Sequence, residues 1–465
     1  MNGFVEVPNR NRRFAYTFED QILTVYSANS LPLTSATDLG ITSSNKFLVA
    51  TNTEKSTLVV FFVDHLPFDD GDAIIWTSTT LKVYYYIDGI HEDRKFSFDR
   101  LCFVFDELNH FFNINAGMKR HITENRTQTI ETLPYEETQK EFSFVCNEKS
   151  ISGEIGIVQV LRWNSTIPLE LHNQLAFAFE PTVNMDFLLN LYAVAKRLFC
   201  LLCYRRNVRI DKVELYGYSE NNLRCTIGIF HPLYSDCSYT EDRKTLEKTV
   251  KFHCLESKLS ELVQAIADEK VLTEHIPETK QDGSRITVAR TILITAAFEW
   301  TFTQTYGSPP LSPYRQEVKA DILEKLDVLP EEKSYNSKKK SEVKLYHKIV
   351  SNVDRNLSEK IQYALKDCAN ILEPFMRRLY AINGMEVAPF AQIADDLQYQ
   401  RNAYAHGQID RELKENIVLD VIILEWLNYC MLFKCIGYDE IDIFNAINQI
   451  FTRGFIDKTK EVYPE

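Results

Sequence analysis

The sequence predicts an α+β protein, with a β-rich, sandwich-like or barrel-like amino-terminal region followed by an all-α carboxy-terminal helical bundle. From about residue 14 to residue 172, short β-branched and aromatic runs alternate with clusters of Asn, Asp, Ser and Gly, which is typical of closely spaced strands. Beyond Ser284 the apolar residues change to a helical period and keep it. We therefore expect residues 1–283 to form the β-rich region, with candidate subdomains 1–182 and 183–283, and residues 284–465 to form the bundle.

The strands of the first region are expected where apolar runs are bounded by turn residues. The clearest runs are Lys46–Thr51, Thr57–Val63, Ala73–Thr77, Leu81–Ile87 and Lys95–Phe105. A helix-length apolar stretch then interrupts the strand pattern, and mixed elements follow it. These are a helix over Met185–Tyr204, strands over Val208–Tyr216 and Leu223–Phe230, and a helix over Leu255–Glu269.

In the second region, Ser284 is the expected N-cap of a helix over Ile286–Tyr306, and Pro309-Pro310 ends it because consecutive prolines cannot continue the helical hydrogen bonds. The segment Pro330–Val343, with three consecutive lysines, is polar enough to predict a solvated loop or a mobile segment. The other expected helices are Tyr314–Leu326, Leu345–Ala381 (one long helix or a broken pair), Pro389–His406, Glu412–Ile436 and Ile441–Phe451. Several helices joined by short turns predict a bundle.

Composition and charge are those of an ordinary soluble protein, with 45% hydrophobic and 25% charged residues. The net charge of −13 argues against a protein that coats nucleic acid electrostatically. Residues 284–465 contain 23 Lys and Arg against 26 Asp and Glu, a net of −3, which leaves −10 for residues 1–283. Scattered cysteines, no signal-peptide profile and no uninterrupted membrane-length apolar run predict a cytoplasmic protein.

One motif concentrates polar chemistry on a predicted helix, the stretch Leu397–Gly407, which contains Arg401, Asn402 and His406. Residues four apart project from the same side of a helix, so Asn402 and His406 are expected together, with Arg401 at the edge of that side. An imidazole exchanges protons near neutral pH, and a guanidinium can bind phosphate through two hydrogen bonds. These three residues are therefore the candidate catalytic residues of a phosphate chemistry, Asn402 being the least specific of them.

The spacing of an Arg followed by a His recurs at Arg224 and His231, inside a segment that reads as a strand. We interpret that second match as accidental, because no polar residue follows the Arg and no helix surrounds it.

Other residues have two open interpretations. Glu299 is either a partner for a cation such as Arg401 or the solvent edge of its helix, and Tyr404 either stacks on a base or packs. The lysines Lys338–Lys340 either contact RNA backbone or form a solvated face. Asp395-Asp396 is a poor metal pair, because adjacent helical positions diverge by about 100°, and Cys200 and Cys203 have zinc-ligand spacing without a second pair, so no metal or cofactor is expected.

With a polar residue directly after Arg401, Ala405 before His406 and amphipathic helices on both sides, the stretch resembles the signature of the HEPN ribonuclease superfamily. The resemblance covers roughly residues 284–455. The layout of a β-rich region before the bundle is similar to ApeA-type proteins of bacterial anti-phage defence. The run Phe98–Phe111 is similar to an aromatic-rich run of their amino-terminal domain, with His110 where a Trp is expected.

This resemblance implies a metal-independent endoribonuclease that acts as a homodimer through the bundle and damages RNA, with tRNA among the candidate substrates, after a phage-derived trigger. Transesterification by the ribose 2′-OH needs a base, an acid and positive charge at the phosphate, and one chain supplies one such His. The alternative is a non-catalytic HEPN module that binds a nucleotide or a partner, with the β-rich part as the recognition domain. RNA cleavage that depends on Arg401 and His406 separates the two.

Overall fold

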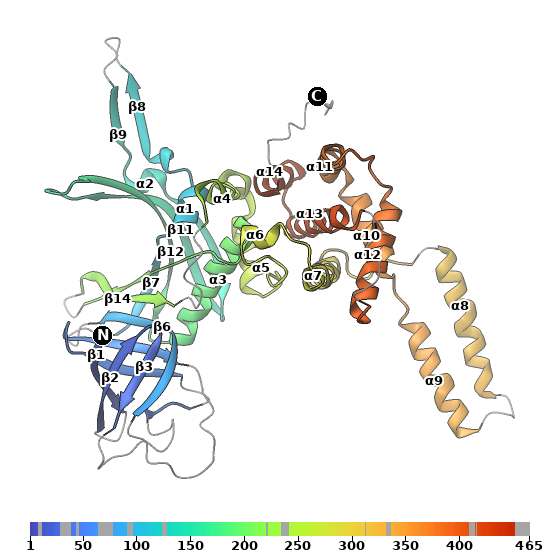
Figure 1. Cartoon of the computed structure of the whole chain (residues 1–465), viewed down its shortest axis with the longest axis horizontal. Helices are drawn as coiled ribbons and strands as arrows, with labels where there is room; N and C mark the ends of the chain where they lie inside the picture. The colour runs from blue at the N-terminus through green and yellow to red at the C-terminus, as the bar shows by residue number, and fades with distance from the viewer. Residues whose placement is uncertain are drawn as a thin grey trace. The chain divides into compact units, whose positions relative to one another are not determined.

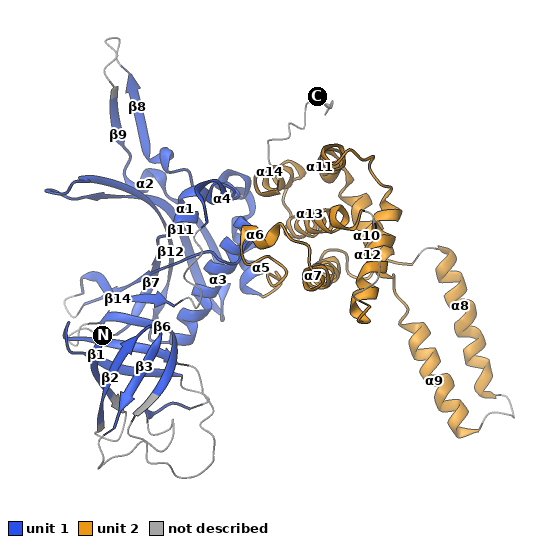
Figure 2. Cartoon of the chain, viewed as in Figure 1, with its two compact units in different colours: residues 1–268 blue, residues 269–465 orange. Residues whose placement is uncertain are grey.

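The computed structural model describes residues 1–7, 12–27, 39–42, 46–63, 78–90, 96–122, 128–219, 222–233, 241–311, 313–331, 336–408, 414 and 416–451. The chain divides into two compact units, residues 1–268 and 269–465, which Figure 2 colours separately. The first is rich in strands and the second is helical, so the predicted α+β class is confirmed. The division lies earlier in the chain than the boundary expected after residue 283.

Six strands at the start of unit 1 close into an antiparallel barrel, drawn in blue in Figure 1. They follow the order β6-β3-β2-β1-β4-β5, and β5 pairs back with β6. The barrel is closed because apolar side chains alternate along each strand and meet inside it, as in Leu23 and Val25 or Leu48 and Ala50. The strands are β1 (Asn2–Val7), β2 (Arg12–Glu19), β3 (Ile22–Tyr26), β4 (Phe47–Asn52), β5 (Thr57–Val63) and β6 (Ser78–Ile90).

The long strand β6 also joins the barrel to a second antiparallel sheet, in the order β6-β14-β13-β7-β12-β11-β10. Helices α3 (Met185–Cys203) and α5 (Leu259–Ala267) pack together, and α5 lies against the edge strand β10. The amide of Gln264 on α5 accepts from Val145 N at 2.7 Å and donates to Val145 O at 3.1 Å, so it satisfies an edge that would otherwise be open. The strands are β7 (Phe98–Phe103), β10 (Lys140–Cys146), β11 (Lys149–Leu161), β12 (Leu169–Thr182), β13 (Val213–Tyr218) and β14 (Arg224–Pro232).

Unit 1 also contains short elements that connect or extend the sheets. They are helices α1 (Asp106–Phe111), α2 (Tyr135–Thr138) and α4 (Arg243–Leu246), and the two-stranded ribbon β8 (Met118–Ile122) and β9 (Gln128–Thr132). The predicted strand Lys95–Phe105 ends early, because Asp106 and Glu107 begin a helix directly after it. The predicted strand Val208–Tyr216 starts only at Val213, and the predicted strand Ala73–Thr77 lies outside the described residues.

Unit 2 is organised around helix α13, in which fourteen of twenty residues are buried. It packs against α7, α11, α12 and α14. The helices of the unit are α6 (Lys280–Gly283), α7 (Val288–Tyr306), α8 (Pro313–Val328), α9 (Ser337–Ser351), α10 (Leu357–Asp367), α11 (Ala369–Ile382), α12 (Phe390–Ala405), α13 (Ile417–Ile436) and α14 (Glu440–Phe451).

Three expectations for this unit are wrong. The N-cap of α7 is Thr287, whose side chain accepts from Arg290 N, while Ser284 ends the short helix α6. The polar segment predicted as a loop contains the start of α9, because Asn336 caps it and lysines are good helix formers. The stretch Leu345–Ala381 is split among α9, α10 and α11, because Asn356 forms a capping box that starts a new helix.

No helix of the described residues combines the length and the apolar character that crossing a membrane requires.

A buried ion pair fastens the start of α7 to the middle of α13. Arg290 donates from Nε and Nη2 to Glu425 Oε1, at 2.9 and 2.5 Å, and only 10% and 4% of the two side chains are exposed. The Nη1 of Arg290 also donates to the carbonyl oxygens of Gly283 and Arg285. The guanidinium is thus nearly saturated, and removing its carboxylate would leave a buried charge without compensation.

We predict that Glu425→Ala destabilises the helical unit by about 3–5 kcal/mol in urea unfolding. The matched control is Glu373→Ala, which removes an exposed partner of Arg377 on the surface of α11 and should cost less than about 0.5 kcal/mol. Equal, small losses in both variants would contradict a structural role for the buried pair.

Candidate functional site

Helix α12 carries the motif, and its sequence decides which side faces out. Its buried positions follow a helical stripe that packs against α10 and α13. They are Ile393, Ala394, Leu397, Gln400 and Ala403. Asn402 and His406 lie off this stripe and are exposed, so their side chains are available to a ligand.

The helix ends immediately after the motif because Gly407 adopts a positive φ of 72°. Gln408 N donates to Ala403 O at 2.9 Å and Gly407 N donates to Tyr404 O at 3.1 Å, which is the Schellman pattern of helix termination. A residue with a Cβ atom is strained in this conformation. Gly407 therefore fixes His406 as the C-cap residue directly after the helix, where its ring is open to solvent.

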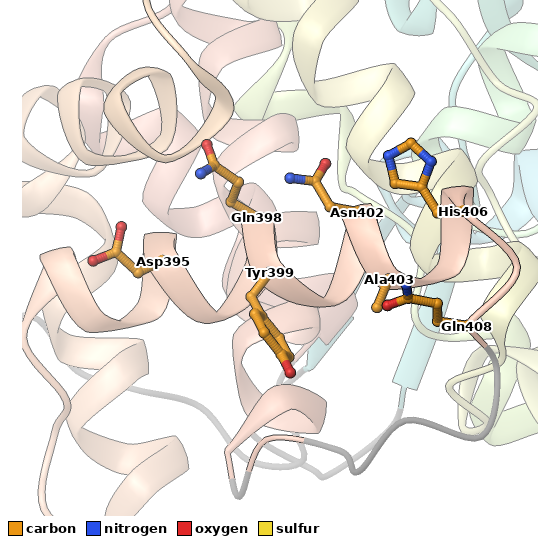
Figure 3. Close-up of a pocket in the computed structure, with 7 residues that line it drawn as sticks. All are labelled: Asp395, Gln398, Tyr399, Asn402, Ala403, His406 and Gln408. Carbon is orange, nitrogen blue, oxygen red and sulfur yellow. The ribbon is translucent and has the colours of Figure 1, made fainter.

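Asn402 and His406 line one pocket of about 470 Å³ (Figure 3). Figure 3 shows Gln398, Asn402 and His406 on the same side of α12, with Tyr399 and Gln408 on the other. The three polar residues are four positions apart, as the sequence led us to expect for Asn402 and His406. Within the described part of the chain, the imidazole of His406 makes no hydrogen bond, so both ring nitrogens remain open for proton transfer.

Arg401 does not line this pocket but borders it. Its Nη1 donates to Asn402 Oδ1 at 3.1 Å, and its Nη2 lies 3.6 Å from Glu299 Oε2. Glu299 had two interpretations, and the structure supports the first, in which it is the partner of the Arg401 guanidinium. The pair is 39% and 35% exposed, so it contributes little stability and an anionic ligand could replace Glu299.

The contact with Arg401 also orients the amide of Asn402. Because Oδ1 accepts from the guanidinium, the Nδ2 group is the part of Asn402 that remains as a donor toward the pocket. Asn402 thus connects Arg401 to the pocket that His406 lines.

Two further residues line the pocket: Asp395, which the sequence analysis considered only as half of a metal pair, and Gln398, which it did not single out. Ser358, at the start of α10, donates from Oγ to Asp395 Oδ1 at 2.5 Å and from N to Gln398 Oε1 at 2.9 Å. The contacts fix α12 against α10 and hold the far end of the pocket. The signal in the sequence was the position of Gln398, four residues before Asn402 on the same face.

The metal interpretations of the sequence find no support in the geometry. Asp395 binds Ser358, whereas Asp396 lies 3.7 Å from Lys414 Nζ, so the two carboxylates have different partners. Burial raises the pKa of the Cys203 thiol to about 12, which opposes the thiolate form that zinc requires. Across the described ranges, no group of three His, Cys, Asp or Glu side chains is arranged to hold a metal ion.

The second Arg and His match lies on strand β14, as predicted. Arg224 Nη2 lies 3.0 Å from Asp99 Oδ1, and the ring of His231 stacks on Tyr86 with centroids 4.6 Å apart. The two residues have separate partners and share no pocket among those of the described residues.

No known family model matches this chain, and no curated protein matches it either.

Asp420, on the buried helix that supports α12, carries an unusual protonation state. Burial, and then repulsion from Asp396, raise its pKa to about 7, although the Tyr380 hydroxyl donates to Oδ1 at 3.3 Å and acts in the other direction. Between the ordinary carboxyl value, about 4, and pH 7, the folded protein keeps a proton that the unfolded chain releases. The free energy of unfolding therefore falls as pH rises through this window and levels off above pH 7.

We predict that Asp420→Asn removes a pH-dependent loss of about 4 kcal/mol between pH 4 and pH 7, so that the variant is more stable than the wild type at pH 8. Chemical unfolding at several pH values measures this difference. Glu386→Gln, at an exposed position, is the control and should leave the slope unchanged. Parallel curves for wild type and Asp420→Asn would show that Asp420 is ionised throughout.

Proposed function

We propose that the protein is a metal-independent endoribonuclease of the HEPN type, which cleaves RNA by attack of the ribose 2′-OH on the adjacent phosphate. The observation that carries this proposal is the placement of Asn402 and His406 in one exposed pocket, with Arg401 hydrogen-bonded to Asn402 at its border. A proton carrier, a neutral donor and a cation adjoin each other at one end of a rigid helix.

Each residue has a role that its environment supports. His406, with both ring nitrogens open, transfers the proton, as the base for the 2′-OH or the acid for the departing 5′-oxygen. Arg401 exchanges its weak contact with Glu299 for the phosphate oxygens and offsets the charge of the phosphorane. Asn402 donates from Nδ2 to a non-bridging oxygen.

The reaction needs a base and an acid at one phosphate, and each chain carries one His406. We therefore place the active site between two copies of the chain, which supply two imidazoles and two guanidiniums. We assign the enzyme to the bacterial cytoplasm as an abortive-infection defence protein, with RNA, including tRNA, as substrate. Residues 1–283 act as the sensor and restraint that a phage-derived trigger releases, which agrees with their net charge of −10 and poor suitability for holding RNA.

We predict that His406→Ala lowers the rate of RNA cleavage at least about a hundredfold without altering the urea unfolding curve, because the residue is exposed and transfers a proton. Arg401→Lys should lose roughly a hundredfold as well, since an ammonium cannot make the two-point phosphate contact. The matched controls are His253→Ala, at an exposed position of unit 1, and Arg224→Lys, in the strand-borne match. Intact cleavage in His406→Ala would refute this assignment and favour a non-catalytic nucleotide-binding or partner-binding module.

A separate prediction concerns the chemistry of the products. Cleavage should continue in EDTA and leave 2′,3′-cyclic phosphate and 5′-hydroxyl ends, because the 2′-OH is the nucleophile. Sequencing of RNA ends after induced expression identifies both the ends and the RNA that is cut. Activity that EDTA stops and Mg²⁺ restores, with 5′-phosphate ends, would mean that a metal-bound water is the nucleophile instead.

A further inference from the structure

One end of the pocket on α12 is built from two polar side chains that the proposed reaction does not use. Asp395 and Gln398 line this end. In Figure 3 they precede Asn402 and His406 along one side of the helix. At a rise of about 1.5 Å per residue, Gln398 lies about 6 Å from Asn402 and about 12 Å from His406 along the helix axis. The pocket therefore extends beyond the groups that meet the scissile phosphate, in the direction in which the rest of a nucleotide can lie.

A buried serine fixes which atom each of these two side chains presents. Ser358 is 3% exposed, and its backbone N donates to Gln398 Oε1 at 2.9 Å while its Oγ donates to Asp395 Oδ1 at 2.5 Å. The same Oγ accepts from Gln362 Nε2 at 3.1 Å, so its single proton is left for Asp395. Because a backbone N–H needs an acceptor, the amide oxygen of Gln398 faces Ser358 and the Nε2 group faces away from it.

This end of the pocket thus presents one acceptor and one donor in fixed places. Among the described residues, Asp395 Oδ2 and Gln398 Nε2 make no hydrogen bond. The carboxylate oxygen can only accept, and the Nε2 group can only donate. The two residues are three positions apart, which separates them by about 4.5 Å along the axis. A fixed acceptor beside a fixed donor is the arrangement that reads the edge of a base.

The order of the two groups distinguishes the bases. From His406, Gln398 comes first along the helix and Asp395 comes last. When the phosphate lies at His406, the group on the base edge that is farthest from the sugar therefore meets Asp395. That group is an amino donor in adenine (N6) and cytosine (N4), and a carbonyl acceptor in guanine (O6) and uracil (O4). The neighbouring ring nitrogen is an acceptor for Gln398 in adenine and cytosine, whereas in guanine and uracil it carries a proton.

We propose that Asp395 and Gln398 form a base subsite, which selects adenine or cytosine in the nucleotide beside the scissile phosphate. With guanine or uracil, a carbonyl oxygen would face the carboxylate and a ring N–H would face the Nε2 group, so both contacts would be lost. The negative charge of Asp395 also disfavours a second phosphate at this end. Single-stranded RNA suits the subsite because its unstacked bases are free to enter it. The inference rests on the proposed function for its ligand, and Ser358 is a positioning residue that acts through both side chains.

Binding of single-stranded decamers tests the subsite apart from the chemistry. Decamers with 2′-O-methyl groups lack the attacking hydroxyl, so they are bound without being cut. By fluorescence anisotropy, we expect the full chain to bind adenosine and cytidine decamers at least about tenfold more tightly than uridine decamers. His406→Ala should keep this preference. Equal affinity for the three decamers, or no binding of any of them, would overturn the subsite.

Exchange of the donor and the acceptor provides a sharper test. The double variant Asp395→Asn/Gln398→Glu has the same net charge as the wild type and can keep both contacts to Ser358. It presents a donor where the acceptor was and an acceptor where the donor was, so uridine decamers should be bound at least about tenfold more tightly than cytidine decamers. Asp396→Asn removes the adjacent carboxylate, which does not line the pocket, and this control should keep the wild-type preference. A double variant with an unchanged unfolding curve and the wild-type preference would overturn the proposal.

The positioning role of Ser358 is tested by adding Ser358→Ala to the double variant. Without the Ser358 hydroxyl, the introduced amide can turn either way, so the inverted preference should disappear. An inversion that persists at full strength would show that Ser358 does not orient the side chain at position 395.

Cleavage of unmodified RNA decamers separates this inference from the proposed function. If the wild-type chain cuts adenosine, cytidine and uridine decamers at equal rates, the subsite fails and the nuclease stands. If the chain binds the decamers with the expected preference but cuts none of them, the subsite stands and the proposed nuclease chemistry fails.

Discussion

The helical unit depends on the burial of α13. Apolar residues lie around the whole circumference of this helix, so other helices must surround it to remove them from water. Five helices, α7, α10, α11, α12 and α14, contact it, and the charges it carries must be satisfied inside that environment. Glu425 is matched by Arg290, whereas among the described residues the one side-chain partner of Asp420 is the Tyr380 hydroxyl, and Asp420 keeps its proton to about pH 7 instead. The position of α12, and so the presentation of Asn402 and His406, follows from packing on this helix.

The division between a rigid support and an open site explains why the motif residues are exposed. The buried stripe of α12 fixes its rotation, and the Schellman end at Gly407 fixes where it stops. The face with Gln398, Asn402 and His406 lines the pocket and is open to a ligand. The RNA substrate proposed above needs no deep cavity, because a flexible strand can bring its phosphate to an exposed helix end.

Much of this arrangement could be predicted from local patterns, and the misses have identifiable causes. The apolar positions Leu259, Leu262, Val263 and Ile266 predicted α5, because burial and helical period coincide there, although the helix begins at Leu259 and not at the expected Leu255. The start of α9 was missed because its lysines suggested solvent exposure, and exposure was mistaken for lack of structure. The link from Ser358 to Gln398 joins segments forty residues apart, and the partner of Arg401 lies about a hundred residues away. A single sequence shows the residue types of such a pair but does not indicate that the two residues are in contact.

The sharing of β6 between the barrel and the open sheet has a mechanical consequence. Its thirteen residues pair with β3, β5 and β14, so three registers are fixed by one strand. A register shift of one residue along β6 would exchange its buried and exposed side chains in both the barrel and the open sheet. A disturbance of β6 in the barrel therefore acts on the same strand that pairs with β14 in the open sheet. In the region that we propose senses a trigger, β6 thus connects the barrel to the open sheet through one continuous strand.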